Sequence, residues 1–211
     1  MLLRYLILLI LPFSDGDKIQ KSFLFHGRNL DFKVCISKDL PEAGSTLEAT
    51  ADSIIILDKN DQHTIQVIIC DENYYSCTKS DTPGFFIEDM NFDGKEDFKL
   101  FESSAKETSN PFFYWLYNPL FNRFEQSPGL EEIMSPVFNK GCKCITSKWN
   151  KGSNINGKTT YKYINGILEV TEEIIEENND GNVYVTTRKQ VDGQLKTISK
   201  NVLKEEEEEE Q

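Results

Sequence analysis

Histidine is nearly absent from this chain, which has two among 211 residues. Most histidine-dependent catalysis is therefore excluded, and we expect the protein not to be an enzyme. Basic residues are also few, because 23 Lys and Arg stand against 35 Asp and Glu, for a formal net charge of −12. Duplex nucleic acid is bound through a basic face, so this balance argues against a nucleic-acid partner.

Long apolar runs are lacking as well. The N-terminal stretch, residues 5–11, is shorter than the about 20 apolar residues that span a bilayer. It follows Arg4 and ends at Pro12, which is the layout of a secretory signal peptide. We therefore interpret residues 1–14 as a signal peptide and expect a periplasmic, envelope or secreted protein with no transmembrane segment. The alternative is a buried N-terminal strand or helix.

Five cysteines are present, and export would permit disulfides between them. Cys70 and Cys77 bracket a short polar segment and could close a small loop. Cys142 and Cys144 would point to the same face of a strand, so a bond between them is sterically awkward. Either could pair with Cys35 instead. A zinc site is the alternative for Cys-x-Cys, but a second ligand pair at suitable spacing is missing.

Helical periodicity is scarce, while short alternating runs recur along the chain. Asn165-Gly166 and Asp192-Gly193 separate β-rich runs and predict two hairpins. The four turn-formers of residues 58–61 predict a third. Alternate polar residues in the last third predict a sheet with one solvated and one packed face; they are Lys162, Glu169, Glu172, Thr186 and Arg188.

These patterns predict an all-β fold, an antiparallel hairpin-built sandwich or small irregular propeller. It contains at most one short helix, near residues 129–134. We expect residues 20–203 to form a single domain. The acidic tail, residues 204–211, is expected to be disordered, since a run of like charges cannot bury a surface.

One motif carries chemistry, the pattern Asp-x-Asn-x-Asp-Gly-x-x-Asp over residues 89–97. Calcium prefers about six to eight oxygen ligands, and alternate side chains of a tight loop can supply them. Gly94 allows the sharp turn that brings the next backbone carbonyl inward. The predicted Ca²⁺ ligands are the side chains of Asp89, Asn91, Asp93 and Asp97 and the backbone carbonyl of Lys95.

The flanking sequence separates this motif from an EF-hand. An EF-hand has a glutamate at position 12 and helices on both sides, whereas position 12 here is Leu100 and both flanks are strand-like. We therefore predict a structural calcium loop between two strands. The alternative is an acidic turn in which Asn and Gly serve only the backbone conformation.

The same residues carry a family resemblance. The chain resembles exported bacterial calcium-loop β-proteins related to FG-GAP/VCBS repeats, and more narrowly a family that includes periplasmic lysozyme inhibitors and immunity proteins against peptidoglycan hydrolases. The resemblance covers roughly residues 85–175 and includes residues 91–98, 114–119, 124, 130, 136, 145–147 and the hairpin 161–170. It implies a non-enzymatic protein that binds a protein partner and inhibits a cell-wall hydrolase.

In such inhibitors a loop near the calcium site enters the hydrolase cleft. The matching segment here is residues 103–110, which is polar and carries a lysine that could meet catalytic carboxylates. The implied partner-binding residues are Ser104, Lys106, Ser109 and Asn110. The alternative is an ordinary connecting loop.

Two further functions remain open. The aromatic residues of 112–117 could form a platform for carbohydrate in an envelope-binding or adhesion module, although such strands more often pack a core. A hydrolase that uses paired carboxylates is the other alternative, but no nucleophile elbow or phosphate loop is present.

Overall fold

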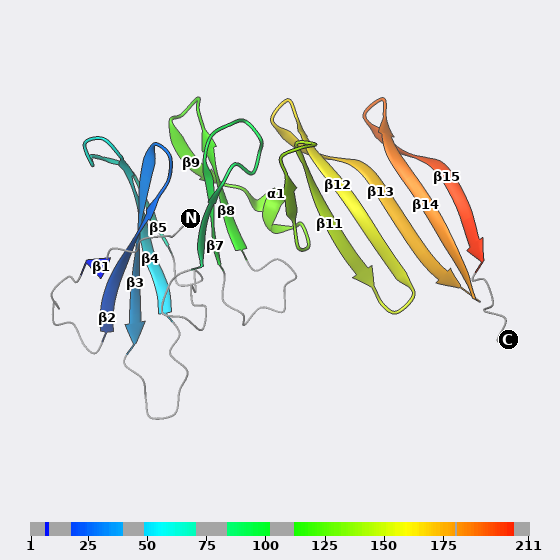
Figure 1. The fold of residues 1–211 in the computed structure, drawn as a ribbon, viewed down its shortest axis with the longest axis horizontal. Coiled ribbons are helices and arrows are strands. Elements are labelled where there is room, and N and C mark those ends of the chain that lie inside the picture. Colours follow the sequence, from blue (N-terminus) through cyan, green and yellow to red (C-terminus); the bar gives the residue numbers. More distant parts are fainter. Residues whose placement is uncertain are drawn as a thin grey trace. The chain divides into compact units, whose positions relative to one another are not determined.

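The computed structural model describes residues 7–8, 18–39, 49–70, 84–101, 112–179 and 181–204. Within these residues, fifteen strands and one helical turn form three antiparallel sheets (Figure 1). The turn, α1 (Pro128–Glu131), is the short helix expected near residues 129–134. The all-β class is confirmed. None of the described helices is long or apolar enough to cross a membrane.

The chain divides into two compact units, Met1–Glu131 and Glu132–Gln211. Residues 20–203 are predicted above as one domain, and the boundary between the units lies within that span. Unit 1 holds a five-stranded and a four-stranded sheet. Their strands are β1 (Ile7–Leu8), β2 (Lys18–His26), β3 (Leu30–Asp39), β4 (Ala49–Asp58) and β5 (Thr64–Ile69), then β6 (Phe85–Glu88), β7 (Asp97–Phe101), β8 (Phe112–Asn118) and β9 (Arg123–Gln126).

The two sheets of unit 1 share one aromatic core, as in a sandwich. Phe32 on β3 and Phe98 on β7 are fully buried and have ring centroids 5.4 Å apart. Phe98 also stacks on Trp115, and Phe124 approaches both phenylalanines. Alternation along each strand sends these side chains inward, so the sheets are joined by burial of aromatic area.

Unit 2 is a single meander of six strands. They are β10 (Val137–Asn139), β11 (Cys144–Lys151), β12 (Ile155–Ile164), β13 (Ile167–Asn179), β14 (Asn182–Val191) and β15 (Gln194–Lys204). The two predicted Asn-Gly and Asp-Gly hairpins are confirmed, since Asn165, Gly166, Asp192 and Gly193 all have positive φ.

The predicted division of this sheet into one solvated and one packed face is wrong. Lys162 lies opposite Glu169, but Arg188 lies opposite Glu173, the neighbour of Glu172. Adjacent residues of a strand point to opposite faces, so the polar positions fall on both sides of the sheet. Two bulges, at Thr160/Tyr161 and Thr187/Arg188, shift the alternation between strands.

The disulfide expectation also needs correction. Cys142 is bonded to Cys144, and Cys35 is a free thiol. Cys142 lies in the turn before β11, and Lys143 between the two has a φ of 48°. This left-handed residue curls the backbone, so the two Cα atoms stand 5.2 Å apart, within the usual disulfide range. The steric objection assumed an extended strand. Cys77 lies outside the described residues.

Two terminal expectations fall mostly outside the described residues. Of residues 1–14 only Ile7 and Leu8 are described, and they pair with Phe23 and Ser22 on β2. That pairing is the arrangement proposed as the alternative to a signal peptide. At the other end β15 ends at Lys204, and residues 205–211 are not described.

Candidate metal centre

The predicted calcium loop lies between β6 and β7, as expected. Glu88 pairs with Asp97 where the strands meet, and residues 89–96 form the loop between them. Phe92 and Gly94 have φ angles of 63° and 88°, so the loop turns sharply twice. The neighbouring strand β8 pairs with β7, which places Tyr117 beside the start of β7.

Backbone N–H groups orient the first three predicted ligands. The N–H of Gly94 donates to Asp89 Oδ2 at 3.1 Å, and the N–H of Asp93 donates to Asn91 Oδ1 at 3.1 Å. The N–H of Lys95 donates to Asp93 Oδ1 at 2.7 Å. Each of these three side chains therefore accepts a backbone N–H of its own loop.

The second oxygen of Asp89 has no partner. Asp89 Oδ1 is buried and accepts no hydrogen bond from the protein. An unpaired buried carboxylate oxygen costs about 1–3 kcal/mol or more, so native structures almost always satisfy such a group. A bound cation would satisfy Asp89 Oδ1, and the oxygen donors of the loop fit calcium. The residues present therefore fit the predicted ion.

Asp97 has a different environment from the other three. It is fully buried, and its Oδ2 accepts the N–H of Met90 at 2.8 Å and of Asn91 at 3.4 Å. Its Oδ1 accepts the N–H of Tyr117 at 2.9 Å. Burial raises the pKa of Asp97 to about 7, against these donors, which favour the carboxylate. Asp97 thus ties the loop to β8 whether or not an ion is bound.

The carboxylate oxygens of the calcium loop lie farther from one another than they would around a bound calcium ion. Among the described residues, the group of three potential ligands whose atoms all lie within 4.8 Å of one another is Asp58, Asp61 and His63. Asp89, Asp93 and Asp97 do not form such a group, so binding would draw them together. In the sequence, residues 58–61 are recognisable only as turn-formers, because the approach of His63 depends on how the turn folds.

In the group of Asp58, Asp61 and His63, the histidine forms an ion pair with Asp61. His63 Nδ1 lies 2.5 Å from Asp61 Oδ1, and both side chains are exposed. The hydrogen bond to Asp61 raises the pKa of His63 above its usual value, and the same bond lowers the pKa of Asp61. The group is therefore a surface ion pair beside Asp58.

The pH dependence of this pair can be measured directly. We expect the NMR titration midpoint of His63 to lie above 6.5, the ordinary histidine pKa, and to fall in Asp61→Asn. A raised folded-state pKa means that the pair stabilises the fold below the unfolded pKa and stops doing so as pH rises through the folded one. A His63 midpoint that is the same in the wild type and in Asp61→Asn would contradict the pair.

The implied partner-binding residues, Ser104, Lys106, Ser109 and Asn110, lie outside the described residues. Their flanking residues do not: Phe101 and Phe112 pair with each other at the end of β7. The calcium loop enters β7 at Asp97, four residues away, or about 13 Å along a strand. The described residues on either side of the segment, Phe101 and Phe112, therefore lie at the end of β7 opposite to the calcium loop.

Two aromatic side chains of the predicted carbohydrate platform are buried inside the protein. Tyr114 and Trp115 on β8 are buried, with 0% and 3% of their surfaces exposed. Trp115 packs in the core of unit 1, while α1 contacts β8. Neither ring has an exposed face on which a sugar could stack. For these two residues the expected role in packing is confirmed.

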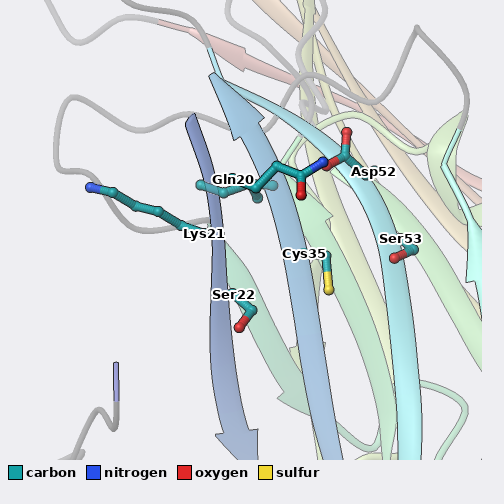
Figure 2. A pocket seen from close by; sticks show the side chains of 7 residues that line it. Gln20, Lys21, Ser22, Cys35, Asp52 and Ser53 are labelled. Atoms are coloured by element: carbon teal, nitrogen blue, oxygen red, sulfur yellow. The ribbon is translucent and has the colours of Figure 1, made fainter. Parts of the chain in front are cut away.

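A cavity of about 200 Å³ lies on β2, β3 and β4, beside the free thiol (Figure 2). Ser22, Cys35 and Ser53 follow one another across these three strands, as their pairing requires. Asp52 lies in the same wall and accepts a hydrogen bond from Ser37 at 2.7 Å. The lining is Gln20, Lys21, Ser22, Cys35, Ile36, Asp52 and Ser53. The cavity has no connection to the calcium loop.

No protein-family model and no curated protein sequence matches this chain. One solved structure, described as that of a Xanthomonas type IV secretion system related protein, is similar in fold. It shares 18% identity, the match covers 87% of this chain and 90% of that chain, and the TM-score is 0.49. A likeness of this size supports no statement about what this chain binds or does.

Proposed function

We propose that the chain is an exported, calcium-stabilised β-protein that binds a protein partner and inhibits a peptidoglycan hydrolase. The observation that carries the calcium part is the buried, unpartnered Asp89 Oδ1, in a loop where the Asn91 and Asp93 side chains accept backbone N–H groups of the same loop. Asp89, Asn91, Asp93 and Asp97, with the carbonyl of Lys95, would hold the ion. When bound, calcium would neutralise these carboxylates and hold residues 89–97 in one conformation.

Export is supported by two features. The N-terminal segment has the composition of a signal peptide. The disulfide between Cys142 and Cys144 is of a kind that persists in oxidising compartments such as the periplasm and the cell exterior. The protein partner and the inhibitory role rest on the family resemblance alone. In this role the chain catalyses no reaction.

The inhibitory role is tested with purified protein and a panel of lysozyme-type hydrolases acting on peptidoglycan. We expect one class of hydrolase to be inhibited in calcium, and inhibition to weaken when Lys106 is replaced by Ala. Lys143→Ala, on a turn of unit 2, is the matched control. If the panel keeps full activity and envelope extract yields no bound hydrolase, the inhibitory role is wrong.

The same preparation addresses the carbohydrate alternative. Retention on peptidoglycan beads without any effect on a hydrolase would favour a glycan-binding module. Tyr114 and Trp115 do not support that function, because both are buried.

A further inference from the structure

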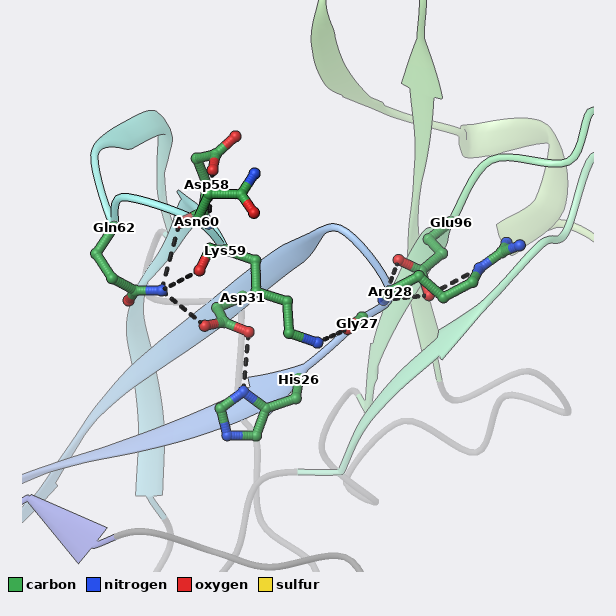
Figure 3. A network of polar contacts seen from close by, with 9 residues as sticks. All are labelled: His26, Gly27, Arg28, Asp31, Asp58, Lys59, Asn60, Gln62 and Glu96. Carbon is green, nitrogen blue, oxygen red and sulfur yellow. Dashed lines mark hydrogen bonds and ion pairs between the residues drawn. The ribbon is translucent and has the colours of Figure 1, made fainter.

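We propose that Glu96 and Arg28 form a latch that positions the calcium loop and sets its affinity for the ion. This inference rests on the proposed calcium site. Glu96 lies between two predicted ligands, Lys95 and Asp97, but it is not a ligand itself. Its side chain points instead to the turn between β2 and β3, residues 27–29, which belongs to the other sheet of unit 1 (Figure 3).

The latch consists of four hydrogen bonds that cross between the sheets. The backbone N–H of Arg28 donates to Glu96 Oε1 at 2.9 Å and Oε2 at 2.7 Å. The Arg28 side chain donates from Nε to Glu96 Oε1 at 3.4 Å and from Nη2 to the carbonyl oxygen of Gly94 at 3.3 Å. Both neighbours of Lys95 are therefore held by a single residue.

Gly27 leaves the space that Glu96 occupies. A Cβ at this position would lie 2.7 Å from Glu96 Oε2 and 2.9 Å from the carbonyl oxygen of Leu30. Contacts that short do not occur, so any larger residue would displace the Glu96 carboxylate or the turn. Glycine is needed at residue 27 for this close approach.

The turn that receives Glu96 is itself anchored. Lys59 Nζ donates to the carbonyl oxygen of Gly27 at 2.6 Å. The backbone N–H of Lys59 donates to the carbonyl oxygen of Asn29 at 3.2 Å. Lys59 belongs to the β4–β5 turn, whose Gln62 donates to the buried Asp31 at 2.9 Å (Figure 3). The turn that contacts the calcium loop, residues 27–29, is therefore itself held in place by the β4–β5 turn.

This geometry bears on affinity through preorganisation. The carbonyl of Lys95 is a predicted ligand, and fixing Gly94 and Glu96 on either side limits where it can point. A ligand held in place before the ion arrives costs less ordering on binding. Residues that orient ligands in this way typically change metal affinity by about tenfold or more when replaced.

Charge is the other cause by which replacing Glu96 would change the affinity for calcium. Replacing Glu96 by Gln removes a negative charge near the ion, but Arg28 already offsets that charge, and its side chain is 64% exposed. Solvent screens the exposed guanidinium of Arg28, whereas the Glu96 carboxylate is only 15% exposed. A double variant, Glu96→Gln with Arg28→Gln, keeps the net charge of the wild type and loses the side-chain latch, so it separates the two causes.

The test is calcium titration by isothermal calorimetry on the full chain. Wild type, Glu96→Gln, Gly27→Ala and the double variant are compared with Glu173→Gln, which breaks a matched Arg–Glu pair in unit 2. We expect the dissociation constant to rise about tenfold in the three latch variants and to stay unchanged in Glu173→Gln. Circular dichroism of the calcium-free proteins confirms that each is folded.

The outcomes separate this inference from the calcium site itself. If wild type binds no calcium, the proposed site is wrong. If wild type binds and the latch variants bind equally well, the site stands and the latch is overturned. If the double variant regains wild-type affinity, charge and not positioning explains the loss, which also overturns the latch.

Discussion

Calcium should raise the melting temperature of the wild-type chain by several degrees over that in chelator, and Asp93→Ala should abolish the difference. Asp93 is exposed, and its carboxylate accepts hydrogen bonds from the Lys95 N–H and the Asn91 side-chain amide, both within the same loop. Its loss should therefore cost little in chelator. An ion that binds only the native state stabilises it by RT ln(1 + [L]/Kd), about 2.7 kcal/mol at a hundredfold excess over Kd.

Differential scanning calorimetry in calcium and in chelator measures this effect. Asp61→Ala is the matched control, because it removes another exposed aspartate from a turn of the same unit. That variant should keep the full calcium response. A response lost in Asp61→Ala and kept in Asp93→Ala would place the ion at Asp58, Asp61 and His63 instead. No response in the wild type would remove the calcium site altogether.

Local chemistry made much of the fold predictable. The hairpin at Asn165-Gly166 and the turn at residues 58–61 follow from residues that tolerate or favour tight turns, and both are confirmed. The flanks of the calcium loop are strands, as their composition indicates. Each of these features depends on neighbours in the sequence, which is why a single sequence was enough.

Features that depend on a single backbone angle or on strand register were not predictable. The bond between Cys142 and Cys144 requires Lys143 to adopt a positive φ, which nothing in the residue type demands. The faces of the β12–β15 sheet depend on two bulges, and a shift of one residue reverses every side chain.

Contacts between residues that are distant in the sequence were not predictable either. Arg28 and Glu96 are separated by 68 positions, and their meeting depends on how the two sheets of unit 1 pack. The motif assigned Asp93 and Asp97 the same role, as ligands. The structure distinguishes them, because Asp93 is exposed and Asp97 is buried among backbone donors.

Because Asp97 is buried and Asp93 is exposed, we expect a second large effect when Asp97 is replaced. Asp97→Asn should destabilise unit 1 by about 1–3 kcal/mol even in chelator, measured above pH 7, where the carboxylate is ionised. The Asp97 carboxylate accepts N–H groups on both oxygens, from Met90, Asn91 and Tyr117. An asparagine amide turned either way presents an NH₂ group to at least one of these donors, so a buried N–H loses its acceptor.

Urea unfolding of Asp97→Asn and Asp93→Asn, each with and without calcium, measures the contrast. Asp93→Asn should lose stability only in calcium, since its carboxylate is exposed and serves the ion. Asp97→Asn should lose stability in both conditions, because the hydrogen bonds of its carboxylate exist without the ion, and should lose more in calcium, where the carboxylate is also a proposed ligand. A loss for Asp97→Asn confined to calcium would mean that the carboxylate acts as a ligand and that its hydrogen bonds contribute nothing to the fold.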